Sequence, residues 1–237
     1  MTAPCFILPG WCLGRGPLLA TAQGLQADFI DLPGYGESPL IADFDAAIAA
    51  IGEKLPAGAQ LIGWSLGAQM ALALAARFPN KISKLVLIAG TVSFVQRDGW
   101  PHGMPPPMLA EFATAIAADA EAMLPRFVGG FNRGDARAKA VTADLLAQAD
   151  PRPTVEVLCT GLDWLRDVDL RPDCERIQCP TLLIQGAADP LMPLAAGQAL
   201  AALIPGSQLA VFDDCAHAPF TSRPDDCLTS LRNFLHD

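Results

Sequence analysis

Short apolar runs recur along the chain, and segments long enough for a helix separate most of them. Such runs predict strands, over residues 5–8, 28–32, 59–63, 84–89, 181–185 and 208–212. Helical patterns follow three of these runs, over residues 65–78, 192–203 and 225–235. Because strands that alternate with helices usually pair in parallel, the pattern predicts an α/β fold with a mostly parallel sheet and helices on both faces.

The alternation stops between about Val95 and Arg171, where helical patterning dominates and no strand pattern occurs. This break predicts a helical cap at residues 96–171, inserted into a core made of residues 1–95 and 172–237. Apolar residues at helical spacing form one face of the cap, namely Met108, Phe112, Ile116, Met123 and Phe127. That face either covers a functional site or packs into the core. Gly129, Gly130 and Gly134 are candidates for flexible points of the cap.

The pentapeptide Gly63-Trp64-Ser65-Leu66-Gly67 lies between a predicted strand and a predicted helix. A serine in this context is typical of a nucleophile elbow, a strained turn that exposes the hydroxyl at the carboxyl edge of a sheet. The turn requires small neighbours, which explains the glycines two residues before and two residues after the serine. Ser65 is therefore the candidate nucleophile.

A serine nucleophile needs a positioned base, which is usually histidine. The chain has three histidines. His217 follows the last predicted strand, where a parallel sheet places loops beside the elbow, and it is the preferred candidate. His102, at the entry of the cap, and His236, the penultimate residue, are the alternatives.

The base in turn needs a carboxylate to orient it. Asp189 follows the predicted strand at 181–185 and is the preferred acid. Asp213 and Asp214 precede His217 closely and are the alternatives, but neighbours in sequence rarely reach the far side of an imidazole ring. An oxyanion also needs two main-chain donors. Leu66 N–H and Trp11 N–H, in the loop after the first strand, are expected to supply them.

Composition narrows the function classes. The net charge of −9 argues against nucleic acid or an anionic membrane as the main partner. Seven cysteines without a CxxC pair suit reduced thiols and a cytoplasmic location, and we expect no metal site and no cofactor. No 18-residue apolar stretch and no signal peptide are evident, and a monomer is expected. The glycine-containing loop at 31–38 lacks the remaining features of a nucleotide-binding motif.

Several segments resemble the α/β-hydrolase superfamily and, more narrowly, the pimeloyl-[acyl-carrier protein] methyl ester esterases of biotin synthesis. They are LPGWCLG at 8–14, DLPGYGES at 31–38, GWSLGA at 63–68, RDGWP at 97–101, GLDWLRDVDLR at 161–171 and CAHAPF at 215–220. The resemblance spans nearly the whole chain. RDGWP and the tryptophan of the elbow are the features that separate this family from general hydrolases.

The resemblance implies an α/β-hydrolase fold with Ser65 as nucleophile, Asp189 as acid and His217 as base. It implies main-chain donors at Trp11 and Leu66, and a methyl-capped pimeloyl chain on a carrier protein as substrate. The chain departs from the superfamily in three ways. It begins almost at the first oxyanion strand, Pro9 replaces a common histidine, and Ala68 stands where glycine is frequent.

The sequence thus predicts a serine carboxylesterase that works through an acyl-enzyme, with an apolar channel under the cap. The candidate lining residues are Trp64, Phe94, Phe112, Phe127 and Trp164. Four cations of the cap are candidate contacts to an acidic carrier protein, with a solvated helix face as the alternative interpretation: Arg126, Arg133, Arg137 and Lys139. The alternative functions are a general short-chain esterase or thioesterase, a menaquinone-pathway lyase, and a non-catalytic ligand-binding module.

Overall fold

A six-stranded sheet with the order β2-β1-β3-β4-β5-β6 organises the computed structural model, which describes residues 3–236. Every pairing between neighbouring strands is parallel. The strands are β1 (Cys5–Leu8), β2 (Asp28–Phe29), β3 (Ala59–Trp64), β4 (Ile82–Ile88), β5 (Thr181–Gly186) and β6 (Gln208–Phe212). The strand predicted at 28–32 is shorter in the structure, where β2 ends at Phe29, although Ile30 N–H still bonds to the carbonyl of Ile7 at 3.0 Å.

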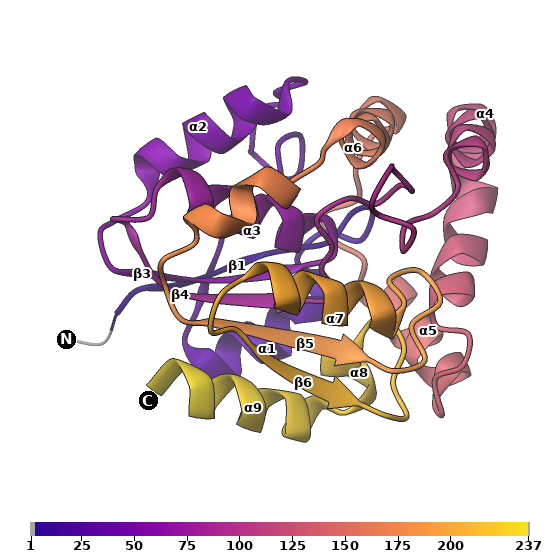
Figure 1. The fold of residues 1–237 in the computed structure, drawn as a ribbon. Coiled ribbons are helices and arrows are strands. Elements are labelled where there is room, and N and C mark those ends of the chain that lie inside the picture. Colours follow the sequence, from indigo (N-terminus) through magenta and orange to yellow (C-terminus); the bar gives the residue numbers. More distant parts are fainter. Residues whose placement is uncertain (1–2, 237) are drawn as a thin grey trace.

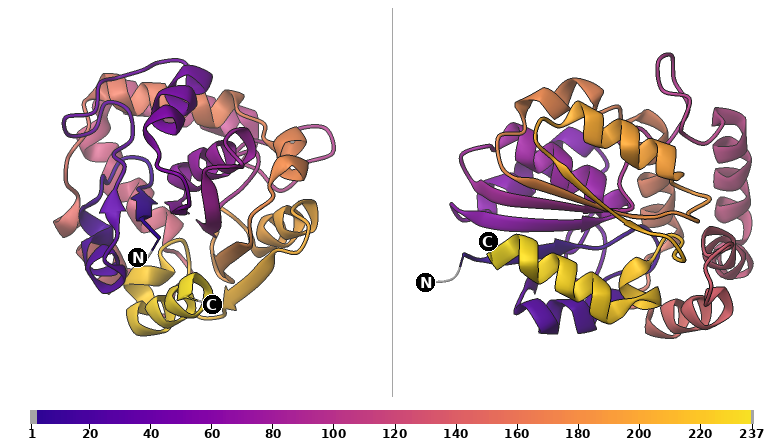
Figure 2. Two further views of the ribbon diagram at one scale, coloured as in Figure 1. Left: turned by 90° about the vertical axis from the view of Figure 1, so that its left-hand side faces the viewer. Right: turned by 60° about the horizontal axis from the view of Figure 1, so that its bottom comes forward.

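Helices cover both faces of the sheet (Figures 1 and 2). One face carries α1 (Leu19–Leu25), which follows the short helix η1 (Gly16–Leu18), and α9 (Pro224–His236), and these two helices contact each other. The other face carries α2 (Phe44–Lys54), α3 (Leu66–Arg77), η2 (Arg171–Arg176) and α7 (Leu194–Leu203). The short helix α8 (Pro219–Ser222) precedes α9. This layering confirms the predicted fold class.

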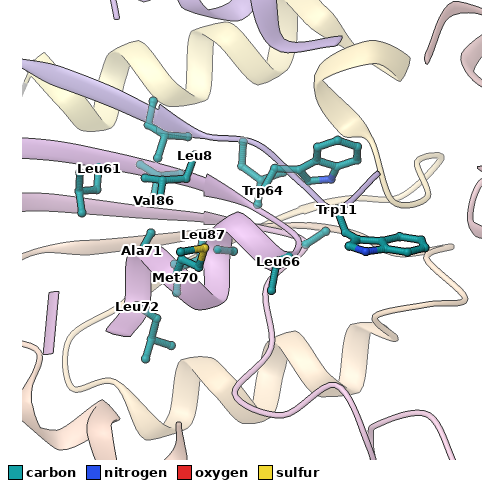
Figure 3. Close-up of a cluster of buried hydrophobic side chains, with 14 of the residues drawn as sticks. Leu8, Trp11, Leu61, Trp64, Leu66, Met70, Ala71, Leu72, Val86 and Leu87 are labelled. Atoms are coloured by element: carbon teal, nitrogen blue, oxygen red, sulfur yellow. The ribbon is translucent and has the colours of Figure 1, made fainter. Parts of the chain in front are cut away.

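The alanine-rich helix α3 forms the centre of the core. Every residue of the helix from Leu66 to Ala76 is buried, because the helix contacts β3 and β4 on one side and α2 and η2 on the other. Small side chains allow this close packing, and the few large ones, such as Met70 and Leu72, fill the space between the layers (Figure 3). The first turn of α3 is thereby held firmly at the end of β3.

The segment between β4 and β5 contains α4 (Pro106–Phe131), α5 (Ala138–Gln148) and α6 (Val155–Asp167). We call residues 96–171 the cap segment. Its helices lie beyond the carboxyl ends of the strands, on the right in Figure 1. Helix α4 is kinked at Asp119, whose φ of −157° and ψ of 79° are not helical, and the side chain of Asp119 caps the second half by accepting from Ala122 N–H at 3.0 Å.

The expected apolar face of α4 is only partly correct. Phe112 and Phe127 point inward and stack on each other with ring centroids 5.0 Å apart, and Ile116 is fully buried. Met108 is instead 56% exposed, because it lies in the first turn of the helix, beyond the covered surface. The domain boundaries at 96 and 171 remain a prediction.

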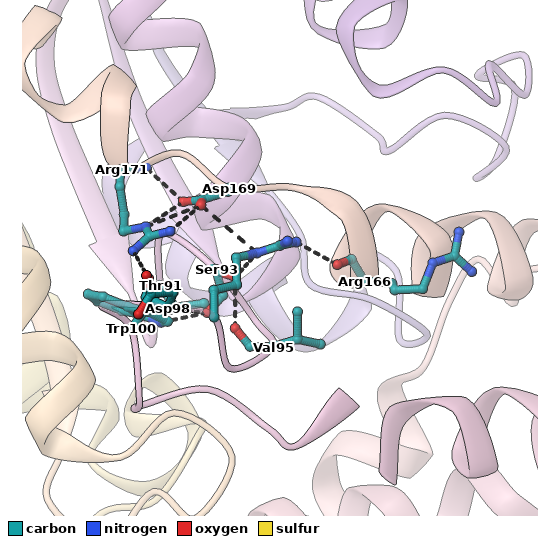
Figure 4. A network of polar contacts seen from close by, with 9 residues as sticks. Thr91, Ser93, Val95, Asp98, Trp100, Arg166, Asp169 and Arg171 are labelled. Atoms are coloured by element: carbon teal, nitrogen blue, oxygen red, sulfur yellow. Dashed lines mark hydrogen bonds and ion pairs between the residues drawn. The ribbon is translucent and has the colours of Figure 1, made fainter. Parts of the chain in front are cut away.

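A polar network joins the two ends of the cap segment (Figure 4). Arg97, in the RDGWP stretch, donates to Ser93 Oγ at 2.9 Å and to the carbonyl of Arg166 at 2.6 Å. Arg171 donates to both carboxylate oxygens of Asp169 and to the carbonyl of Asp98. The RDGWP stretch and the DVDLR stretch are therefore bonded to each other, and this contact joins the beginning of the cap segment to its end.

Membrane insertion through a helix finds no support in the part of the chain that the structure describes. Among residues 3–236, no helix combines the length and the apolar character that a bilayer crossing requires.

Candidate active site

The GxSxG pentapeptide forms the turn from β3 into α3. Ser65 has φ 56° and ψ −117°, a strained conformation for a residue with a side chain, and its N–H bonds to the carbonyl of Ile88 at 3.0 Å. A Cβ atom at Gly63 would collide with the backbone of Ala68, and one at Gly67 would collide with the carbonyl oxygens of the loop after β1. Glycine at both positions is therefore a steric requirement of this turn.

Three side chains that are far apart in sequence meet at this turn. His217 Nε2 lies 3.0 Å from Ser65 Oγ, and His217 Nδ1 lies 2.7 Å from Asp189 Oδ2. All three side chains are largely buried: Ser65 is 9% exposed, Asp189 3% and His217 1%. Distances of about 2.6–3.2 Å are those required for proton transfer between a hydroxyl and a base.

Main-chain donors hold the carboxylate of Asp189. Its Oδ1 accepts from Leu191 N–H at 2.8 Å and from Met192 N–H at 2.9 Å, which leaves Oδ2 for the imidazole. Gln185 donates to the carbonyl of Met192 at 2.5 Å and so fixes the same turn. The hydrogen bonds compensate the cost of burying the carboxylate.

The alternative bases and acids lie elsewhere. His102 packs edge-on against Trp100, with ring centroids 5.1 Å apart, and His236 is exposed at the end of α9. Asp213 and Asp214 are both exposed, and Asp189 rather than either of them lies at Nδ1 of His217. The structure thus brings together the preferred candidates and not their alternatives.

The two expected oxyanion donors come from separate elements, and Trp11 borders the same cavity as Ser65. Leu66 N–H begins α3, and Trp11 N–H lies in the loop after β1; among the described residues neither has a main-chain acceptor outside the regular elements. The indole of Trp11 donates to the carbonyl of Leu158 at 3.0 Å, and Cys12 N–H donates to Tyr35 Oη at 2.9 Å. Burial raises the pKa of Tyr35, so its hydroxyl stays protonated at this position.

An apolar cavity of about 20 Å³ adjoins Ser65 and His217. Four of the five predicted lining residues border it: Trp64, Phe94, Phe112 and Phe127. Trp164 does not, and this prediction is wrong. Its ring packs against Phe44, 5.8 Å away, and its Nε1 donates to the carbonyl of Ala42, because it lies on the face of α6 that contacts the α2 side of the core.

Sequence reasoning missed several lining residues. They are Trp11 through its side chain, Met104, Leu109, Phe131, Leu162, Leu165 and Leu191. Met104 reaches the cavity because a short bridge pairs it with Val95 inside the 93–104 loop. No local pattern distinguishes these residues from ordinary core positions, so only the packing of distant elements identifies them.

The four cations of the cap segment are exposed and lie near the junction of α4 and α5. Arg137 is not free in the described part of the chain, because its guanidinium donates to the carbonyl of Ser222 at 2.8 Å. No hydrogen bond or ion pair engages the side chains of Arg126, Arg133 and Lys139 within residues 3–236. These three charges are therefore available to a partner.

A family model described as the alpha/beta hydrolase family matches residues 5–229, and the chain belongs to this family. Membership confirms the predicted fold and the predicted enzyme class, a hydrolase.

Two curated relatives are similar along almost their whole length. A pimeloyl-[acyl-carrier protein] methyl ester esterase of Aromatoleum aromaticum is 40% identical, with 97% of this chain and 96% of the relative covered. One of Chromobacterium violaceum with the same name is 34% identical, with 97% and 92% covered. Among solved structures, an esterase from Exiguobacterium antarcticum superposes with a TM-score of 0.88 at 23% identity, covering 100% of this chain and 93% of that one, which supports the fold alone.

Proposed function

We propose that this hydrolase is a serine carboxylesterase that removes the methyl group from a pimeloyl chain carried by an acyl carrier protein. The observation that carries the esterase activity is the pair of contacts from His217, at 3.0 Å to Ser65 Oγ and 2.7 Å to Asp189 Oδ2. The substrate is inferred from the names of the relatives and from the resemblance at RDGWP and the elbow.

In the proposed reaction, His217 Nε2 takes the proton of Ser65 as Oγ attacks the ester carbonyl carbon. The resulting oxyanion accepts from the N–H groups of Trp11 and Leu66. His217 then gives its proton to the departing methoxide, which leaves as methanol, and the acyl group remains on Ser65. Water, deprotonated by His217, attacks this acyl-enzyme; the bond to Ser65 Oγ breaks, His217 returns the proton to that oxygen, and the free terminal carboxylate is released.

Asp189 holds the imidazole so that Nδ1 donates to the carboxylate and Nε2 faces Ser65. It also stabilises the imidazolium that forms during attack. No metal or organic cofactor enters these steps, because the proton transfers occur among the three side chains and water.

The apolar cavity suits the acyl chain in character but not in size. A volume of about 20 Å³ is close to the room needed for a single water molecule. Binding of a pimeloyl chain therefore requires side chains around the cavity to move, and the stacked rings of Phe112 and Phe127 are among those that border it.

Carrier recognition is assigned to the exposed cations of the cap segment. A carrier protein with an acidic surface is attracted to Arg126, Arg133 and Lys139 even though the whole chain is negative, because charges beyond about 8 Å are screened at physiological salt. Arg137 also contacts Ser222, so its substitution changes the fold locally as well as the surface charge. Location in the cytoplasm remains a prediction.

The decisive assay follows methanol release and the mass of the acyl chain on purified carrier protein bearing methyl-pimeloyl groups. Wild type is expected to convert this substrate, and the Ser65→Ala variant is expected to lose several orders of magnitude in turnover. Hydrolysis of p-nitrophenyl acetate without hydrolysis of the carrier-linked ester would favour a general esterase. Tight binding without any turnover would favour a ligand-binding module.

The carrier surface is tested with the double variant Arg126→Glu and Arg133→Glu. It is expected to raise KM for the carrier-linked ester about 10-fold or more while sparing p-nitrophenyl acetate. The control is Glu121→Gln, which changes an exposed charge of the same helix in the other direction. Equal losses on both substrates would remove the carrier role from these arginines.

A further inference from the structure

His217 lies in the loop between β6 and α8. Hydrogen bonds from other segments of the chain hold this loop in place. The carbonyl of Cys215 accepts from Ala188 N–H at 2.9 Å, and the carbonyl of His217 accepts from the indole of Trp64 at 2.9 Å. A third contact comes from the cap segment, where Asp135 Oδ2 accepts from Ala216 N–H at 3.0 Å. This peptide N–H immediately precedes the histidine.

Asp135 is a buried carboxylate, 7% exposed, in the turn between α4 and α5. Its other oxygen, Oδ1, accepts from Arg137 N–H at 2.7 Å and from Ser222 Oγ at 2.9 Å. The carboxylate of Asp135 thus accepts three hydrogen bonds, and the three donors belong to three different segments of the chain. A buried carboxylate is tolerated when it is hydrogen-bonded in this way, and loss of the carboxylate leaves the donors without partners.

The turn that carries Asp135 lies directly against the loops of the acid and of the base. Ala136 N–H donates to the carbonyl of Asp214 at 3.0 Å, two residues before the Ala216 contact. Gly134 has φ 99°, and a Cβ atom there would lie 3.2 Å from Ala188, next to the acid. The turn therefore contacts the base loop at two points, the carbonyl of Asp214 and the N–H of Ala216.

We propose that Asp135 is a positioning residue that sets the place of the His217 main chain relative to Ser65. This inference rests on the proposed esterase function. Asp135 does not touch the reacting atoms; it acts through the Ala216 peptide. Because proton transfer requires about 2.6–3.2 Å between base and hydroxyl, a shift of the loop lengthens the contact from Nε2 to Oγ beyond that range. The cap segment thereby contributes to the base as well as covering the cavity.

The test compares Asp135→Ala, Asp135→Asn and Ser222→Ala with wild type on p-nitrophenyl acetate. Asp135→Ala is expected to lower kcat by about 10- to 100-fold, as misplacement by about 1 Å does, with KM changed less than about twofold. Asp135→Asn is expected to recover part of this loss, because its amide oxygen still accepts from Ala216 N–H. Reaction of Ser65 with a fluorophosphonate is expected to slow in parallel with kcat.

Ser222→Ala separates positioning from stability. It removes one hydrogen bond of Asp135 but keeps the contact to Ala216, so we expect a lower unfolding midpoint and a loss of kcat below about threefold. Asp144→Ala, an exposed acid on α5, is the matched control and is expected to change neither quantity.

Thermal unfolding monitored by circular dichroism establishes that each variant is folded at the assay temperature. Wild-type kcat in folded Asp135→Ala would overturn the inference, and so would a rise in KM without a fall in kcat. An equal fall of kcat in Ser222→Ala and Asp135→Ala would also overturn it, since stability alone would then explain the loss. Absence of esterase activity in wild type would refute the proposed function instead.

Discussion

The indole Nε1 of Trp64 donates to the main-chain carbonyl of His217 at 2.9 Å, across 153 positions of the sequence. The tryptophan of the elbow thus holds the backbone of the residue that faces the nucleophile. Its ring also packs against His217, with centroids 5.7 Å apart, and against Phe220 and Phe131. Trp64 therefore links the nucleophile turn directly to the base loop.

Replacing Trp64 by phenylalanine removes this donor but keeps an aromatic ring. The carbonyl of His217 then loses its partner while buried, at a cost of about 1–3 kcal/mol, and kcat on p-nitrophenyl acetate is expected to fall about 10-fold. Trp164→Phe is the matched control, because it loses an indole bond to Ala42 away from the cavity. The two variants should lose similar stability in urea unfolding. A comparable fall of kcat in Trp164→Phe would contradict the role of Trp64.

Gly161 on α6 faces the indole of Trp11. A Cβ atom at this position would lie 2.5 Å from Cδ1 and 2.8 Å from Nε1, so Gly161→Ala must displace the ring and weaken its bond to Leu158. Because the main chain of Trp11 is a proposed oxyanion donor, kcat is expected to fall about 10-fold or more. Steady-state kinetics on p-nitrophenyl acetate measures the effect.

Gly130→Ala is the counterpart on α4, where a new Cβ atom meets nothing within 4 Å. Alanine in a helix is about 0.5–1 kcal/mol more favourable than glycine, so the free energy of unfolding should rise with kcat unchanged. A fall of kcat in this variant would instead support the expectation that Gly130 is a flexible point of the cap.

Gln69 in α3 is 1% exposed, and neither polar atom of its side chain has a hydrogen-bond partner among the described residues. Gln69→Met keeps the shape and removes the buried polar atoms, so we expect a gain of about 1–2 kcal/mol in the free energy of unfolding. Gln185→Met should have the opposite sign, because Gln185 is bonded to Met192. Urea unfolding decides between these outcomes, and a loss of stability in Gln69→Met would show that Gln69 is satisfied in solution.

Two buried thiols give the stability a specific pH dependence. Burial raises the pKa of Cys174 and of Cys227 from 9.0 to about 12. Above pH 9 the unfolded thiols release protons that the native thiols keep, so the contribution of these two thiols to stability is fully present below pH 9 and is lost as pH rises toward 12. Each thiol contributes a slope of about 1.4 kcal/mol per pH unit in that range.

This slope is measured by urea unfolding between pH 8 and pH 10.5. Cys174→Ala and Cys227→Ala should each flatten it, whatever their effect on stability at pH 8. Cys159→Ala, which changes a half-buried thiol, is the comparison. An unchanged slope in both buried variants would mean that these thiols ionise as readily in the native protein as in the unfolded one.

The strand and helix pattern of the core could be predicted because it depends on local periodicity and on glycine and proline at turns. The nucleophile was predictable for a related reason. The tight turn requires small residues at fixed positions, and the five consecutive residues 63–67 meet that requirement. The contacts from His217 to Ser65 and Asp189 are consistent with the order of loops after parallel strands, which all end at one edge of the sheet.

The cap segment was less predictable. Its helical character follows from periodicity, but the kink at Asp119 and the exposure of Met108 do not. The prediction that Trp164 lines the cavity was wrong because the sequence pattern of an amphipathic helix is the same whether its aromatic residue faces a cavity or the core. The packing of α6 against α2 decides which one it is.

By itself, the sequence determined the layered fold and the chemical groups at the carboxyl edge of the sheet, because both depend on spacing within short segments. Only the tertiary structure decided what holds those groups in register. The indole bond to the His217 carbonyl and the carboxylate bond to the Ala216 amide each join segments more than 80 residues apart. Such bonds exist only after the chain has packed, since no local pattern specifies which distant donor will meet a given acceptor.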